Sequence, residues 1–262
     1  MFVKRAAFGL IRQFHFLFAD RGLPSKVALY LHSIEPQHHA AFEAMVRGFK
    51  EAGYRFCGPA DYVAAKDKVV FASFDDNYEA WYDALPFFDQ LKERFTFYVN
   101  TLPLADRADG ATISDYFSRL RHTGEWKPLS SDQLRFIHRA GHVIGTHSHS
   151  HFDLASLPFD QAVEEIRVGR AGLEEITGAP VRHLSFPFGM RRHFSDHLRA
   201  WCRENGFLTV SNAVPGGLHA PTDPFNLHRT LWDFGRAHEM NERILRVDGR
   251  LFERWTGKSA VG

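Results

Sequence analysis

The chain has 262 residues, of which 44% are hydrophobic and 24% charged, and its formal net charge is +1. These proportions are typical of a globular protein with a sizeable core and exclude an intrinsically disordered chain. The near balance of 32 basic and 31 acidic residues gives no general electrostatic reason to bind nucleic acid, so we expect no nucleic-acid partner. The two cysteines, Cys57 and Cys202, lack the paired spacing of a zinc or redox motif.

The N-terminal segment, residues 1–26, is amphipathic. Two basic residues precede a short apolar run, but Arg12 interrupts this run before it reaches the length of a signal peptide. Apolar residues from Ala7 to Phe18 recur instead at helical spacing. We expect a helix that packs on the domain, with contact to a membrane surface as the alternative. No stretch reaches the ~20 apolar residues of a transmembrane helix, so a cytoplasmic protein is expected.

Short apolar runs alternate with helical patterns from residue 27 onward, without a linker or repeat. The expected strands are Val27 to Leu31, Val69 to Phe74, Phe95 to Asn100, His142 to Thr146, Leu184 to Phe186 and Leu208 to Ser211. The expected helices are His39 to Glu51, Ala80 to Lys92, Ser131 to Arg139, Phe159 to Ile176 and Ser195 to Asn205. This alternation predicts parallel strands in one α/β domain, residues 27–262, folded as an open doubly wound sheet or a closed barrel.

A polar segment at about residues 105–129 interrupts the alternation after the third expected strand. We interpret it as an insertion. Long loops in compact domains are often functional lids or binding loops, and a solvated structural excursion is the alternative.

Two adjacent carboxylates follow the apolar run from Val69 to Phe74. Asp75 and Asp76, followed by Asn77, stand at the carboxyl end of an expected buried strand. In barrel enzymes that end of the strands carries the active site. A structural role as helix cap and turn is the alternative, because Asp and Asn favour both positions.

Three histidines follow another apolar strand, in the run His147-Ser148-His149-Ser150-His151. Neutral imidazole is a good zinc ligand, and one carboxylate beside two imidazoles leaves positions open for water and substrate. His147 and His151 would share a face if the chain turned helical there, whereas His149 would point away. A surface cluster without function is the alternative.

A third group, Ser185-Phe186-Pro187-Phe188-Gly189, follows the strand expected at Leu184. Its proline and glycine predict a tight loop at the same rim, which would aim a backbone N–H at a substrate carbonyl. An ordinary turn is the alternative.

These three groups, in this order, resemble the motifs of the polysaccharide deacetylase family, carbohydrate esterase family 4. The run Ser73-Phe74-Asp75-Asp76-Asn77 is similar to its Thr-Phe-Asp-Asp-Gly motif, in which the first Asp is the base and the second binds metal. The histidine run is similar to its His-Ser/Thr-x-x-His motif, which supplies two metal ligands. Pro187-Phe188-Gly189 resembles the end of its Pro-Tyr-Gly motif, and the resemblance covers about Val27 to Trp232.

The resemblance implies a distorted (β/α) barrel that removes N-acetyl groups from a sugar or polysaccharide and releases acetate. It makes Asp75 the catalytic base and Asp76, His147 and His151 the ligands of a divalent metal. Zinc suits these ligands first, with nickel, cobalt, manganese or iron as alternatives.

Further substrate contacts are expected from the rim. Phe188 and Gly189 are candidates for binding the substrate and the oxyanion. Trp126 is a candidate for stacking on a sugar ring, and Tyr116 and Trp232 are further candidates for stacking.

The chain departs from the family pattern near the base and at the general acid. Asn77 replaces a glycine, a mild change because Asn tolerates left-handed backbone. Ser185 stands where many members carry an arginine that orients the base, so Arg182 or Arg229 is expected to replace it. The late Leu-x-His motif of the family, which supplies the acid, has no clear match. The candidate acids are His228, His32, His219 and His238.

The sequence leaves two other functions open. A chain without a general acid could be a carbohydrate-binding protein that has kept the barrel and lost catalysis. An amidohydrolase that acts on a small non-sugar amide is the second alternative.

Overall fold

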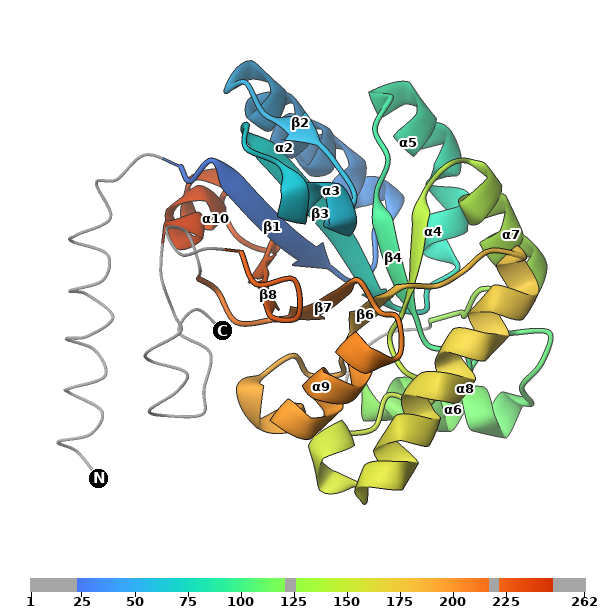
Figure 1. The fold of residues 1–262 in the computed structure, drawn as a ribbon. Helices are drawn as coiled ribbons and strands as arrows, with labels where there is room; N and C mark the ends of the chain where they lie inside the picture. Colours follow the sequence, from blue (N-terminus) through green and yellow to red (C-terminus); the bar gives the residue numbers. More distant parts are fainter. Residues whose placement is uncertain (1–22, 121–125, 217–221, 247–262) are drawn as a thin grey trace, which may run out of the picture.

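The computed structural model describes residues 23–120, 126–216 and 222–246 (Figure 1). The helix expected in residues 1–26 therefore lies almost wholly outside the described residues. Within the described residues, no helix is both long enough and apolar enough to cross a membrane.

Parallel strands form a nearly closed barrel with helices around it, so the expected (β/α) barrel is confirmed (Figure 1). Around the barrel the strand order is β8-β7-β6-β5-β4-β3-β1-β9, and the short β2 pairs with β3. All six expected strands are present. Their observed bounds are Lys26–Leu31 (β1), Val69–Asp76 (β3), Thr96–Val99 (β4), Val143–Thr146 (β5), His183–Ser185 (β6) and Thr209–Asn212 (β7).

The two edge strands of the barrel come from one segment that sequence patterns did not predict as a strand. β8 (Leu227–His228) pairs with β7, and β9 (Thr230–Leu231) pairs with β1. Only Arg229 separates these two short strands, so the two ends of the sheet are joined through this one residue. Two-residue strands carry too little alternation to be recognised in sequence.

The helices pack around the strands. Their bounds are His39–Glu51 (α2), Pro59–Ala64 (α3), Ala80–Asp83 (α4), Leu85–Leu91 (α5), Gly110–Arg119 (α6), Ser131–Arg139 (α7), Phe159–Thr177 (α8), Asp196–Glu204 (α9) and His238–Leu245 (α10), with 3-10 turns at Pro36–His38 (η1), Leu154–Ser156 (η2) and Arg191–His193 (η3). The single helix expected from Ala80 to Lys92 is wrong: Pro86 lacks a backbone N–H, and the chain forms α4 and α5 instead. α3, α6 and α10 were not predicted.

Helix ends follow local chemistry that can be read in the sequence. Ser130 and Gln133 form the capping box at the start of α7. Gly178 ends α8 with φ 68°, a left-handed conformation that glycine adopts without strain.

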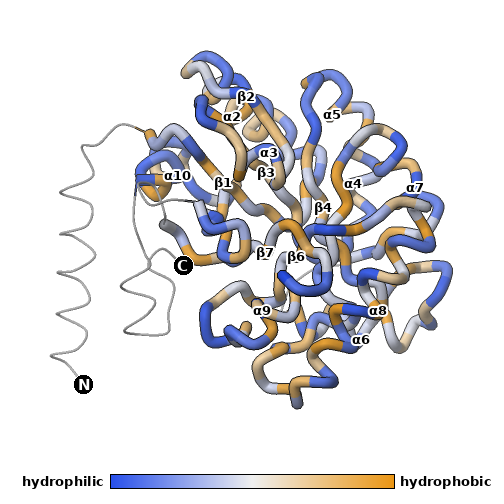
Figure 2. Tube along the Cα trace, in the orientation of Figure 1, coloured by the Kyte–Doolittle hydropathy of each residue, from blue (hydrophilic) through white to orange (hydrophobic). Residues whose placement is uncertain are grey.

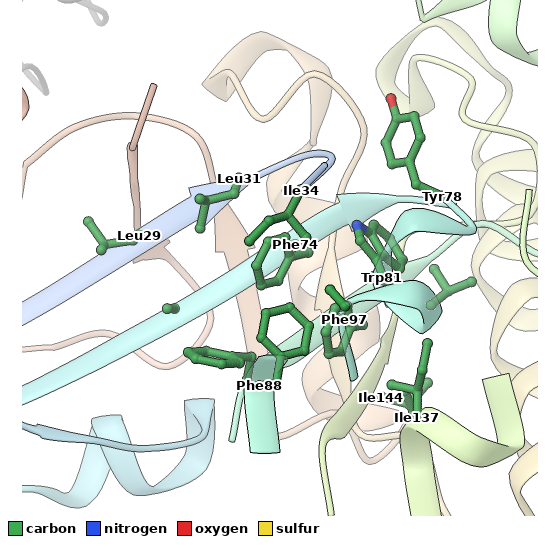
Figure 3. Packing of buried hydrophobic residues seen from close by; sticks show 14 of the residues in the cluster. Leu29, Leu31, Ile34, Phe74, Tyr78, Trp81, Phe88, Phe97, Ile137 and Ile144 are labelled. Atoms are coloured by element: carbon green, nitrogen blue, oxygen red, sulfur yellow. The ribbon is translucent and has the colours of Figure 1, made fainter. Parts of the chain in front are cut away.

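The largest core cluster lies between the barrel and helices α2, α4, α5 and α7 (Figure 3). Phe74, Phe88 and Phe97 pack there with ring centroids 5.1 to 6.1 Å apart. Figure 2 shows the same division, with hydrophobic stretches along the central strands and many hydrophilic residues on the outer turns and helices. This packing fixes β3 and β4 side by side and so positions the residues at their carboxyl ends.

His142 is buried against this aromatic cluster. Its Nδ1 accepts a hydrogen bond of 3.1 Å from the backbone N–H of Phe95, and its ring stacks on that of Phe95. Burial is the main cause that lowers the pKa of His142 from 6.5 to about 4. The side chain is therefore neutral at pH 7 and costs stability wherever it must be protonated.

We predict that His142 makes the protein acid-sensitive. Its pKa is lower in the folded chain than in the unfolded chain, so unfolding takes up a proton and stability falls as the pH drops from about 6.5 to 4. The loss due to this residue should be roughly 2–3 kcal/mol. His142→Asn keeps an acceptor for Phe95 but does not titrate. The free energy of unfolding, measured with denaturant at pH 7 and at pH 4, should fall less between these two pH values in the variant than in the wild type. Equal falls in the two proteins would contradict the assignment.

Candidate active site

Asp75 and Asp76 are the last two residues of β3, and both are buried. They lie at the carboxyl end of the barrel strands, as expected from the sequence. Asp76 has φ 89°, a backbone conformation that is strained for any residue with a side chain. Strain of this kind persists only where the surrounding structure enforces it.

Arg229 reaches Asp75 from the segment that closes the barrel. Its Nη1 and Nη2 donate to the two carboxylate oxygens of Asp75, each at 2.7 Å. The remaining donors bind Ser73 Oγ, Ser185 Oγ and the carbonyl of Asn212, at 2.6 to 3.0 Å. All five N–H donors of this fully buried guanidinium are therefore satisfied.

Aromatic faces complete the surroundings of this ion pair. The guanidinium carbon of Arg229 lies 5.2 Å from the ring centroids of both Tyr30 and Tyr98. Burial raises the pKa of each tyrosine to about 12, so both rings stay neutral. Among the residues that the structure describes, Asp75 is the carboxylate that pairs with the charge of Arg229.

Burial by itself would raise the pKa of Asp75, but the adjacent Arg229 and then His147 outweigh it and lower the pKa below its usual value. Ser185 Oγ donates a further hydrogen bond of 3.1 Å to the same carboxylate. Asp75 is therefore ionised at neutral pH. The short side chain of Ser185 lies directly against the guanidinium of Arg229, with Oγ 2.6 Å from Nη2.

The side chains of Asp76, His147 and His151 converge at the cavity. Their candidate ligand atoms all lie within 4.8 Å of one another. Asp76 Oδ1 is 3.5 Å from His147 Nε2 and 3.3 Å from His151 Nε2. The three residues predicted as metal ligands are thus brought together, and all are buried.

The surroundings of these three residues fit a divalent metal. Tyr78 donates to Asp76 Oδ2 at 3.2 Å, which leaves Oδ1 directed at the histidines. His147 Nδ1 lies 2.7 Å from the carbonyl of Ser185, so it carries the proton and Nε2 keeps its lone pair for a metal. Burial lowers the pKa of His151, which favours the neutral imidazole that a metal requires.

The histidine run is an irregular loop and not a helical turn. Ser148 and His151 have φ values of 67° and 61°, and this backbone bends both ligands toward Asp76. His149 points away, as expected, with Nδ1 2.8 Å from Thr101 Oγ1. Positive φ occurs at Asp76 and not at Asn77, so the replacement of glycine by Asn77 causes no backbone strain.

The side chain of Asn77 joins two backbone segments beside the site. Its buried side chain donates to the carbonyl of Asn100 at 2.8 Å and accepts from the N–H of Leu129 at 2.7 Å. The backbone N–H of Ala105 also bonds the carbonyl of Leu129, so the two ends of the predicted insertion meet beside the site.

A cavity of about 470 Å³ opens over the three ligands and Asp75. Phe188 and Gly189 line it, as the sequence predicts for that loop. Phe188 is 46% exposed with φ 62°, and a Cβ at Gly189 would meet Ala213 at 2.3 Å. Only glycine allows this loop to lie so close to the chain after β7.

Among the candidate acids that the structure describes, only His32 lines the cavity. His32 lines the cavity directly after β1, and Trp81 Nε1 donates to its backbone carbonyl at 2.7 Å. His228 does not line the cavity; its neighbour Arg229 points into the barrel, and successive strand residues face opposite sides. His238 lies at the start of α10, outside the cavity, and His219 is outside the described residues.

The aromatic residues expected at the rim are placed differently. Tyr116 is fully buried and donates to Asn100 Oδ1 at 2.9 Å, and Trp232 is buried in the core. Stacking of either residue on a sugar is excluded by burial. Trp126 is half-buried, packs on Tyr78 at 5.2 Å between ring centroids, and does not line the cavity.

No pattern in the sequence identified several of the residues that line the cavity. They come from three segments: Arg119 and Leu120 from the insertion, Asp153 after the histidine loop, and Arg192 and His193 from η3. Only the tertiary fold brings these segments to the strand ends, although the polar insertion itself was recognisable.

We predict that Arg229→Met destabilises the protein by about 3–5 kcal/mol, because it leaves the buried carboxylate of Asp75 without its partner. The double variant with Asp75→Asn should recover part of this loss. Denaturant unfolding measures both. The exposed Arg182, the other arginine that the sequence offered for orienting the base, is the control, and Arg182→Met should unfold like the wild type. Equal loss in both arginine variants would contradict the prediction.

Comparisons with known proteins bear on the family and on the fold. The family model described as polysaccharide deacetylase matches residues 62–210. IcaB from Ammonifex degensii shares 21% identity and a TM-score of 0.68, over 86% of this chain and 98% of that one. The deacetylase PplD of Streptococcus pyogenes, solved in complex with acetate, shares 18% sequence identity and a TM-score of 0.65, over 84% of this chain and 96% of that chain.

A de-N-acetylase from Aggregatibacter actinomycetemcomitans shares 16% identity and a TM-score of 0.64, over 84% of this chain and 99% of that chain. At these identities the solved structures establish the common barrel fold. No curated protein sequence matches the chain significantly. The family model, however, spans more than half of the 262 residues, and the chain therefore belongs to the polysaccharide deacetylase family.

Proposed function

We propose that the chain is a metal-dependent N-deacetylase that hydrolyses the acetamide of an N-acetylated sugar and releases acetate. The observation that carries the proposal is the ionised Asp75, held by Arg229, directly beside the Asp76, His147 and His151 group. A protein that only binds sugar needs neither a general base nor metal ligands, and these four residues line one cavity.

The metal would be held by Asp76, His147 and His151. Two imidazoles and one carboxylate favour zinc, and the same set accepts nickel, cobalt, manganese or iron. When bound, a divalent metal supplies a Lewis acid that polarises the acetyl carbonyl and makes water more acidic.

Asp75 is assigned as the general base. It takes a proton from the water whose oxygen adds to the acetyl carbon, and Arg229 holds the carboxylate in place for this transfer. Phe188 and Gly189 border the space for the acetyl group.

His32 is assigned as the general acid. It lines the cavity and is close enough to Asp75 and Asp76 that its charge lowers the pKa of both carboxyls. A protonated His32 would give its proton to the sugar nitrogen as the carbon–nitrogen bond breaks, so that the amine leaves neutral and acetate is released.

The binding-only alternative rested on the missing arginine and the missing acid. Two contacts argue against this alternative: Arg229 donates to the Asp75 carboxylate, and His32 lines the cavity. A hydrolase for a small non-sugar amide shares the same chemistry and differs only in substrate.

Asp75→Asn should lower the rate of acetate release from N-acetylglucosamine oligomers by about 10²–10⁴-fold, because no base remains to accept the proton. A chelator should abolish release in the wild type, and zinc or cobalt should restore it. The matched control is Asp160→Asn, an exposed aspartate at the start of α8. Full activity after verified metal removal would contradict the metal dependence. Release only from small amides would reassign the substrate.

The two leading acid candidates can be compared directly. His32→Gln should lower kcat by about 10²–10⁴-fold for a substrate with a poor amine leaving group. His228→Gln should leave kcat unchanged, because this side chain lies outside the cavity. Steady-state kinetics on both purified variants measures this, and the reverse order of effects would overturn the assignment of the acid.

A further inference from the structure

Helix α8 contacts the loop between the two metal-ligating histidines with unusual closeness. A Cβ at Gly169 would lie 2.7 Å from the carbonyl carbon of Ser148 and 2.8 Å from Thr146 Oγ1. These separations are shorter than side-chain carbons tolerate, so only glycine at this position lets the loop rest on the helix.

Glu165 lies one helical turn before Gly169, on the same face of α8. Both of its carboxylate oxygens accept from Ser150: Oε2 from the backbone N–H at 2.8 Å and Oε1 from Oγ at 2.9 Å. The backbone carbonyl of Glu165 also accepts from the N–H of His149 at 3.0 Å. One residue of α8 therefore holds two consecutive residues of the loop.

The other side of the loop is held by the segment after β4. The N–H of Leu102 donates to the carbonyl of His149 at 3.0 Å, and Asn100 Nδ2 donates to the carbonyl of His147. Ser148 and His151, which flank the two residues held by Glu165, have left-handed backbone that costs energy in each case. A free loop would relax from this shape, so the hydrogen bonds to Glu165 oppose that relaxation next to His151.

We infer that Glu165 is a positioning residue for metal binding, which fixes the loop so that His147 and His151 face Asp76 before a metal arrives. The inference rests on the proposed metal site. A loop ordered in advance does not lose its conformational freedom on binding, so the metal binds more tightly. Because Glu165 is fixed to Ser150 and not to a ligand, its removal should move metal affinity more than it moves the fold.

The test measures Co²⁺ binding to the full, metal-stripped chain by visible absorption against a competing chelator. Glu165→Ala removes both carboxylate acceptors and should weaken Co²⁺ binding by about tenfold or more, the range found when groups that orient metal ligands are removed. Glu165→Gln keeps one acceptor oxygen and should lose less. The Co²⁺ absorption band of Glu165→Ala should also shift, because the ligand geometry changes.

Two controls separate positioning from general destabilisation. Glu164→Ala alters the exposed neighbour that pairs with Arg167 and should bind Co²⁺ like the wild type. Ile166→Val trims a buried residue of the same helix and should lower the melting temperature of the metal-free chain without changing Co²⁺ affinity.

Unchanged Co²⁺ affinity in Glu165→Ala would overturn the role of Glu165 while leaving the metal site intact. An equal loss of affinity in Ile166→Val would overturn it as well, because the effect would then track stability alone. A wild-type chain that binds no Co²⁺ would overturn the metal site and this inference together.

Discussion

The buried ion pair between Arg229 and Asp75 connects the fold of this protein to its chemistry. Removing two charges from water is costly, and the cost is offset only when partners and geometry are complete. Here the guanidinium uses all five donors and lies between two neutral tyrosine rings. Arg229 is also the residue between β8 and β9, so the segment that joins the two edges of the sheet carries the side chain that holds the Asp75 carboxylate.

A second constraint is the strained backbone around the cavity. Asp76, Ser148, His151 and Phe188 all have positive φ, and three of them carry or adjoin groups of the candidate metal site. Such conformations persist because neighbouring elements leave no alternative: the aromatic core fixes β3, while α8 and the segment after β4 hold the histidine loop. The packing around β3 and the histidine loop therefore sets the positions of the candidate metal ligands.

The residues of the candidate site differed in how far the sequence revealed them. Asp75, Asp76, His147 and His151 follow apolar strands directly, and parallel strands end at the same rim, so their meeting could be predicted. Arg229 could only be named as one of two candidates, because nothing local to it indicates which distant carboxylate it meets. Trp126, Tyr116 and Trp232 were expected at the rim from residue type alone, and such residues more often lie inside the protein, as the two buried ones do here.

By itself, the sequence determined the α/β barrel, five of the helix regions, all the longer strands, the family, and the meeting of Asp75, Asp76, His147 and His151 at the carboxyl ends of the strands. These depend on local periodicity, capping and residues adjacent to strand ends, which are short-range properties of the chain. Only the tertiary structure decided that β8 and β9 lie at the two edges of the sheet, that Arg229 binds Asp75, that His32 and not His228 lines the cavity, and that Glu165 holds the histidine loop. Each of these depends on contacts between residues far apart in the sequence, and no local pattern encodes which distant residues meet.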